Sequence, residues 1–230
     1  GTSSNNIIVI MDKVEWNSSD TLTGNATITS LYAGVDYRTD GAELKISSNM
    51  NINGDVTFDN IKLYSSSTTV SDGSDYLAAG NYSNVLITNY GDVILGRGVS
   101  TPDDKYTFGA VVGGNYKDET TKNTIGIHTV IVEAGKYNNI IVGSSLNSPT
   151  TGRKYVSHQV ILGTMKEAAI SRNDKLTITG YLSMGELEDR CYPYNRDGSQ
   201  NTTLGYTRYY AITKVYSAKF TGDNKFKKAS

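Results

Sequence analysis

The fold is decided by a stretch that reads Thr129-Val-Ile-Val-Glu-Ala-Gly-Lys-Tyr-Asn-Asn-Ile-Ile-Val-Gly143. Val130 and Val132 are two residues apart, the spacing of a short β-strand that buries one face. Gly135 and the Asn138-Asn139 pair interrupt the apolar residues. Glycine and asparagine tolerate the positive φ angles of sharp corners. The stretch therefore predicts a strand, a corner and a second strand.

The same alternation of apolar residues recurs along the chain and predicts an all-β protein. Only Met165 to Ser171 has a helical pattern, and it is two turns long at most. Ser and Thr supply 49 of the 230 residues, which suits short strands with polar outward faces. The clearest alternating pairs are Leu44 and Ile46, Met50 and Ile52, Val56 and Phe58, Ile61 and Leu63, Val93 and Leu95, Val160 and Leu162, and Leu176 and Ile178.

Internal repeats favour a solenoid of parallel strands. The eight residues from Gly80 align without gaps on those from Gly135, and Gly54-Asp-Val-Thr-Phe aligns with Gly91-Asp-Val-Ile-Leu. The spacing between repeats varies, as expected when insertions loop out at corners. We therefore predict a single-stranded right-handed parallel β-helix. An antiparallel β-sandwich or jelly roll is the alternative, because it also has many short strands separated by turns.

Two segments, Asn51 to Leu63 and Thr129 to Gly143, resemble coils of right-handed parallel β-helix proteins of the pectate-lyase-like superfamily. They are most similar in style to adhesin-like surface proteins of gut bacteria. The resemblance covers about residues 44 to 184. It implies an extracellular protein that presents a long parallel sheet for contact with carbohydrate or a host surface.

We expect one β-helix domain over residues 1–230, with four regions. An N-terminal cap region spans 1–43, coils span 44–184, a long loop bearing Tyr and Arg spans 185–209, and a C-terminal strand region spans 210–230. Gly1 stands where an initiator methionine is usual. We therefore expect a fragment of a larger protein, with signal and anchor outside this chain.

Composition excludes several classes of function. The net charge of −1 predicts no binding to nucleic acid, and the lack of a long apolar run predicts no insertion into a membrane. Cys191 is the only cysteine and the chain has two histidines, so we expect neither a disulfide nor a metal site. No cofactor is predicted. The near absence of cysteine, with abundant Asn, Ser and Thr, favours an extracellular or cell-surface location.

Several clusters of charged residues are candidates for catalysis. Glu186, Glu188 and Asp189 lie beside Arg190, and Asp103-Asp104 precedes Lys105. Glycoside hydrolysis needs two facing carboxylates. Adjacent acids in a loop are more often solvated turns, so we predict no catalytic residue.

The histidines and three further aromatic residues have structural interpretations. His128 and His158 are thirty residues apart and could stack on neighbouring coils, although we expect ordinary outward-facing positions. Trp16 is expected to cap one end of the coil stack. Tyr116 and Tyr137 follow glycine corners and are expected to pack there.

Tyrosine is the strongest indication of a ligand surface. Five of the 17 tyrosines fall between Glu186 and Tyr210, interleaved with arginines. A tyrosine ring can stack on a sugar while its hydroxyl donates a hydrogen bond. The alternative is that these rings cap the stack, whose open strand edges need cover. The predicted ligand-binding residues are Tyr192, Tyr194, Arg196, Tyr206, Arg208 and Tyr209.

The sequence thus predicts a non-catalytic, adhesin-like domain that contacts a glycan or a host surface. A β-helical polysaccharide lyase or glycoside hydrolase is the first alternative. A carbohydrate-binding module of a larger enzyme is the second. A groove that gathers a basic residue and two or more acids on one parallel sheet would favour the enzyme.

Overall fold

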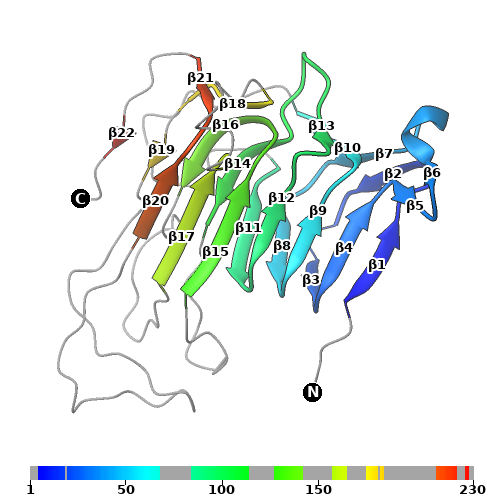
Figure 1. Cartoon of the computed structure of the whole chain (residues 1–230), viewed down its shortest axis with the longest axis horizontal. Helices are drawn as coiled ribbons and strands as arrows, with labels where there is room; N and C mark the ends of the chain where they lie inside the picture. Colours follow the sequence, from blue (N-terminus) through cyan, green and yellow to red (C-terminus); the bar gives the residue numbers. More distant parts are fainter. Residues whose placement is uncertain are drawn as a thin grey trace, which may run out of the picture.

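The protein is all-β and its strands form parallel sheets (Figure 1). A computed structural model describes residues 5–18, 20–67, 84–113, 127–141, 157–164, 175–180, 182–183, 211–221 and 226–227. Within these ranges every strand pairing is parallel except that of β5 (Leu31–Tyr32) with β6 (Val35–Asp36). The antiparallel sandwich is therefore wrong for the described residues. The predicted helix at 165–171 lies outside them.

Three sheets contain the remaining strands, and we name them A, B and C. In spatial order, sheet A holds β1 (Asn6–Val9), β4 (Ala26–Thr29), β9 (Val56–Phe58), β12 (Val93–Leu95), β15 (Ile127–Val132), β17 (Ser157–Leu162) and β20 (Ala211–Val215). Sheet B holds β2 (Lys13–Trp16), β7 (Glu43–Ile46), β10 (Ile61–Ser65) and β13 (Val99–Ser100). Sheet C holds β3 (Thr21–Thr23), β8 (Met50–Asn53), β11 (Leu86–Tyr90), β14 (Phe108–Val112), β16 (Gly135–Ile141), β18 (Leu176–Ile178) and β21 (Lys219–Phe220), with β19 (Leu182–Ser183) and β22 (Phe226–Lys227) beside this series.

Up to β14 the chain visits sheets A, B and C in turn, and from β15 on its described strands belong to sheets A and C alone. Each return to sheet A adds a strand next to the previous one. The chain passes from β1 to β2 to β3 and then back to sheet A at β4. We call one such passage a rung and number the rungs 1 to 7 along sheet A. Rung 1 begins at Asn6, inside the region 1–43 that the sequence suggested as a cap.

The core is built from columns of apolar side chains that stack in register. One column of sheet A joins Ala26, Val56, Val93, Val130 and Val160, all at most 4% exposed. Opposite sheets meet where Phe58 packs edge-to-face on Phe108, with ring centroids 6.5 Å apart. Such stacking explains how a chain with few apolar residues still fills its narrow interior.

A glycine column forms the corner that precedes sheet A. Gly24 and Gly91 have φ angles of +92° and +90°, and Gly54 lies between them in the column. A Cβ on Gly91 would overlap the backbone of Gly54, and a Cβ on Gly54 would overlap that of Gly24. At Gly24 the same space is open. Successive rungs therefore approach too closely at this corner for any side chain.

A ladder of side-chain oxygens runs beside the glycine column. The Asn25 Oδ1 accepts the backbone N–H of Asp55 at 3.0 Å, and the Asp55 Oδ1 accepts that of Asp92 at 2.9 Å. The Asp92 Oδ1 in turn accepts the N–H of Thr129 at 2.9 Å. Each corner thus fixes the backbone of the next rung.

Charges alternate on the outer face of sheet B. The Glu43 carboxylate lies 2.8 Å from the Lys62 Nζ and 3.6 Å from the Lys13 Nζ, and it accepts the Tyr64 hydroxyl at 2.8 Å. The hydrogen bond from Lys62 is the main reason that the pKa of Glu43 is lowered. Burial, followed by the bond to Glu43, raises the pKa of Tyr64.

Two aromatic residues occupy the positions expected from the sequence. Tyr137 is fully buried beside the Gly135 corner, where its hydroxyl donates to the Ala134 carbonyl at 2.8 Å. Burial raises the pKa of Tyr137. Trp16 is partly buried against the end of the core, and its indole N–H donates to the Asn49 carbonyl. Tyr116 lies outside the described residues.

Candidate functional site

An open groove of about 840 Å³ lies along the later rungs, between sheet C and the segment that contains β13. We call it the basic groove. Five cationic side chains line it, and Asp103 supplies the single carboxylate among its described lining residues. The cations are Arg38, Arg97, Lys136, Lys175 and Lys219. Hydroxyl groups come from Ser100, Thr101, Thr177, Thr179 and Thr221.

The floor of the groove is the outer face of β16, β18 and β21. Lys136 pairs in register with Thr177, and Thr177 pairs with Lys219, so the three form one column across three rungs. In β18, Leu176 and Ile178 point into the core and are fully buried, which turns Thr177 outward between them. The alternation of the strand therefore places polar groups on the groove.

A tyrosine holds the floor in place at one corner. The Tyr106 hydroxyl lies 3.1 Å from the Thr179 Oγ1, and the Lys136 Nζ sits 5.2 Å from the centroid of its ring. The same ammonium donates to the Asp103 carbonyl at 2.8 Å. These contacts fix the Lys136 side chain by a cation–π interaction and a hydrogen bond.

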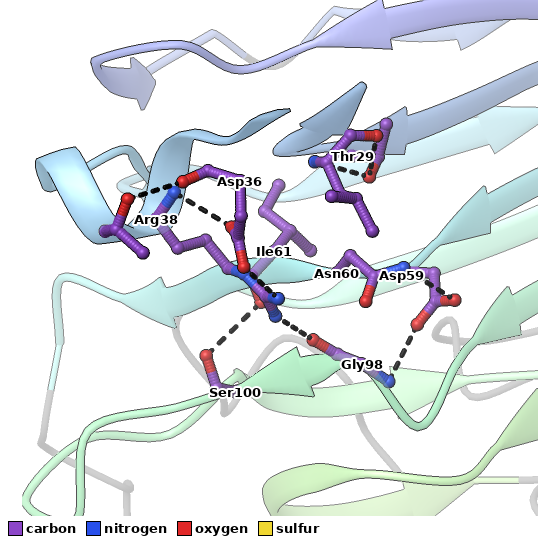
Figure 2. A network of polar contacts seen from close by, with 10 residues as sticks. Thr29, Asp36, Arg38, Asp59, Asn60, Ile61, Gly98 and Ser100 are labelled. Carbon is purple, nitrogen blue, oxygen red and sulfur yellow. Dashed lines mark hydrogen bonds and ion pairs between the residues drawn. The ribbon is translucent and has the colours of Figure 1, made fainter. Parts of the chain in front are cut away.

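The wall of the groove is fixed by Arg38 and Asp59, which hold the loop between β12 and β13 (Figure 2). The Gly98 N–H donates to the Asp59 Oδ1 at 2.7 Å, and the Gly98 carbonyl accepts from the Arg38 Nη1 at 3.2 Å. A Cβ at Gly98 would crowd both Asp59 and Asn60. Glycine is therefore required for this close approach.

The Arg38 guanidinium is itself positioned by Asp36, at the start of the short 3-10 helix η1 (Tyr37–Asp40). Its Nε and Nη2 atoms donate to the two Asp36 oxygens at 2.8 and 2.6 Å. This hydrogen-bonded pair lowers the pKa of Asp36 and raises that of Arg38. The guanidinium is thus held at the edge of the groove in an ion pair, in which the Asp36 carboxylate balances its charge.

The ligand residues predicted from the sequence fall outside the part of the chain that the structure describes. Tyr192, Tyr194, Arg196, Tyr206, Arg208 and Tyr209 are outside the described residues, as are Glu186, Glu188, Asp189, Arg190 and Cys191. Asp103 and Asp104 are exposed and form a turn, and Asp104 pairs with Lys105 at 3.5 Å. His128 and His158 pair in register on β15 and β17.

None of the five cations of the groove is among the ligand residues predicted from the sequence. They span residues 38 to 219, so nothing in the local sequence joins them. The Gly135-Lys136 dipeptide is the one local signal, because a glycine corner marks the start of a strand, here β16, and so places Lys136 on a sheet. Only the strand register reveals that Lys136 and Lys219 share a column with Thr177.

A metal centre is absent from the described part of the chain. There, no three His, Cys, Asp or Glu side chains lie close enough together to hold a metal ion. No helix in the same residues is long and apolar enough to span a bilayer. Comparisons with protein-family models, curated proteins and solved structures found no match for this chain.

Proposed function

We propose that the chain is a right-handed parallel β-helix that serves as a non-catalytic binding and display domain. The support for a β-helix is the stacking of successive parallel strands in three sheets, which the chain visits in turn as far as β14. The right hand is the one that parallel crossover connections adopt almost without exception. Its proposed place is outside the cell or on the cell surface, which agrees with the polar composition and the single cysteine.

The proposed activity is contact with a glycan, and the basic groove is the observation that carries it. The groove combines hydroxyl groups with cations on the rigid face of a sheet. Hydroxyls can both donate and accept hydrogen bonds, which suits the hydroxyl-rich edges of sugars. Side chains held on strands lose little conformational freedom when a ligand binds.

The groove supports binding better than hydrolysis. Hydrolysis of a glycosidic bond uses two carboxyl groups at a defined separation. The described lining of the groove offers one carboxylate, that of Asp103. A segment that bears Tyr and Arg, residues 185–209, remains a second predicted contact with the ligand.

Binding of the whole chain to a glycan array tests the proposal. We expect retention of at least one class of glycan by the unmodified protein. The variant Thr177→Trp should block the groove floor and reduce retention at least about tenfold, which corresponds to about 1.4 kcal/mol.

Thr57→Trp is the matched control. Thr57 and Thr177 each occupy the outward, partly buried centre of a three-residue strand between two buried neighbours. Thr57 lies on sheet A, away from the groove, so its variant should retain the glycan. The proposed function is refuted if the unmodified chain retains no glycan on the array.

A further inference from the structure

The charge of the basic groove differs from that of the whole chain. The chain carries a net charge of −1, yet five cations and one carboxylate line the groove. Clustered cations raise the local concentration of anions and strengthen their binding. The groove therefore selects for negative charge in a ligand, although the molecule as a whole does not.

The direction of the groove sets the shape of the ligand. Lys136, Thr177 and Lys219 lie on three neighbouring strands, so the column runs across the strands and along the stack. Two strand spacings separate the two lysine backbones, which is about 9.6 Å. A ligand that reaches both ammonium groups must be extended along the stack, with a group between them that meets the Thr177 hydroxyl.

The chemistry of the lining distinguishes an acidic glycan from a nucleic acid. Proteins that bind single-stranded nucleic acid stack the bases on aromatic side chains. No aromatic side chain lines the described part of the groove. The nearby Tyr106 already uses its hydroxyl for Thr179 and one face of its ring for Lys136. What the groove presents is hydroxyl groups between cations.

We propose that the basic groove binds a linear acidic glycan, whose carboxylate or sulfate groups meet Lys136 and Lys219 and whose hydroxyls meet the threonines between them. This rests on the proposed function, because it names the class of glycan for the same site. Arg97 and Lys175 line the groove together with these lysines.

Retention on immobilised polysaccharides of known charge tests the inference. The whole chain would be compared on a polyuronate, a sulfated dextran, neutral dextran and single-stranded DNA, each over a range of salt concentration. We expect retention on the polyuronate, the sulfated dextran or both, and its loss as salt rises. The first two arms distinguish carboxylate from sulfate as the recognised group.

A double variant and its control locate the binding. Lys175→Gln with Lys219→Gln removes two cations of the groove and should weaken retention about tenfold. Lys13→Gln with Lys214→Gln changes the net charge equally on sheets B and A, outside the groove, and should weaken it less than twofold. Circular dichroism would establish that both variants remain folded.

The outcomes separate this inference from the proposed function. Retention of neutral dextran without any dependence on salt would keep the proposed function and overturn the acidic ligand. Equal losses in the two double variants, or equal retention of DNA, would also overturn it. If none of the polysaccharides is retained, the acidic ligand is overturned, and the glycan array then decides whether the proposed function stands.

Discussion

The glycine column at the corner before sheet A gives the sharpest test of the fold. Replacing Gly91 by Ala places a methyl group against the backbone of Gly54 in the preceding rung. Replacing Gly24 by Ala adds a methyl group at almost the same φ angle, +92° against +90°, but this methyl group enters open space. The two variants therefore differ in the contact between rungs and share the strain of the backbone.

The expected magnitudes follow from these two contributions. A positive φ costs a residue with a Cβ about 1–2 kcal/mol, and both variants carry this cost. Forcing a methyl group into occupied space adds about 1–3 kcal/mol. Alanine also restricts the unfolded chain, but equally at both sites. We expect Gly24→Ala to lose about 1–2 kcal/mol of unfolding free energy and Gly91→Ala about 2–5 kcal/mol.

Urea unfolding followed by far-ultraviolet circular dichroism measures the difference. The midpoint of Gly91→Ala should lie well below that of Gly24→Ala, with an unchanged slope. Equal midpoints for the two variants would refute the reasoning. They would mean that successive rungs do not touch at this corner.

Three further perturbations probe the outer face, the core and the groove wall. The pKa of Glu43 is lowered in the folded protein, so its carboxylate stabilises the fold above the unfolded pKa near 4.5, and this contribution is lost as pH falls through the folded pKa. Glu43→Gln should therefore lower the free energy of unfolding by at most about 1 kcal/mol at pH 7. The difference between the variant and the unmodified protein should vanish when unfolding curves are measured in acid. Phe58→Ala removes a fully buried ring and should cost about 3–5 kcal/mol in thermal or urea unfolding, whereas a loss below 1 kcal/mol would contradict the packed core. Asp59→Ala should cost about 1 kcal/mol and weaken glycan retention, because the Gly98 N–H loses its acceptor, and Asp59→Asn should restore most of both.

Much of the fold could be predicted from the sequence because side chains alternate in and out of each strand. The repeat that begins at Gly54 and Gly91 is confirmed, since Val56 pairs with Val93 and Phe58 with Leu95. The dipeptide Asn53-Gly54 is typical of hairpins, yet here it joins β8 of sheet C to β9 of sheet A. The corner of a parallel stack and the turn of a hairpin favour the same residues.

The second repeat shows the limit of pattern matching. A gapless alignment of Gly80 with Gly135 places Val85 opposite Ile140. In the structure Leu86 pairs with Val111, and Val111 pairs with Ile140. Val85 and Leu86 are both fully buried, so this segment does not alternate and the pattern does not fix its register.

The groove was less predictable than the fold because it also depends on strand register. Its cations belong to five separate segments of the chain, and each alone resembles an ordinary lysine or arginine. They gather because Lys136, Thr177 and Lys219 share a column, which depends on the lengths of the insertions between strands. Those lengths carry no signal in residue type.

The length of a rung also bears on how the chain acquires its structure. Thirty residues separate Ala26 from Val56, 37 separate Val56 from Val93 and again Val93 from Val130, and 30 separate Val130 from Val160. At the two ends of sheet A the steps differ, with 20 residues from Asn6 to Ala26 and 53 from Val160 to Thr213. The loop that must close to add a strand is therefore similar for the middle rungs and longest for the last. Because the entropy of closing a loop grows with its length, the middle strands meet comparable barriers, and β20 joins the stack at the greatest entropic cost.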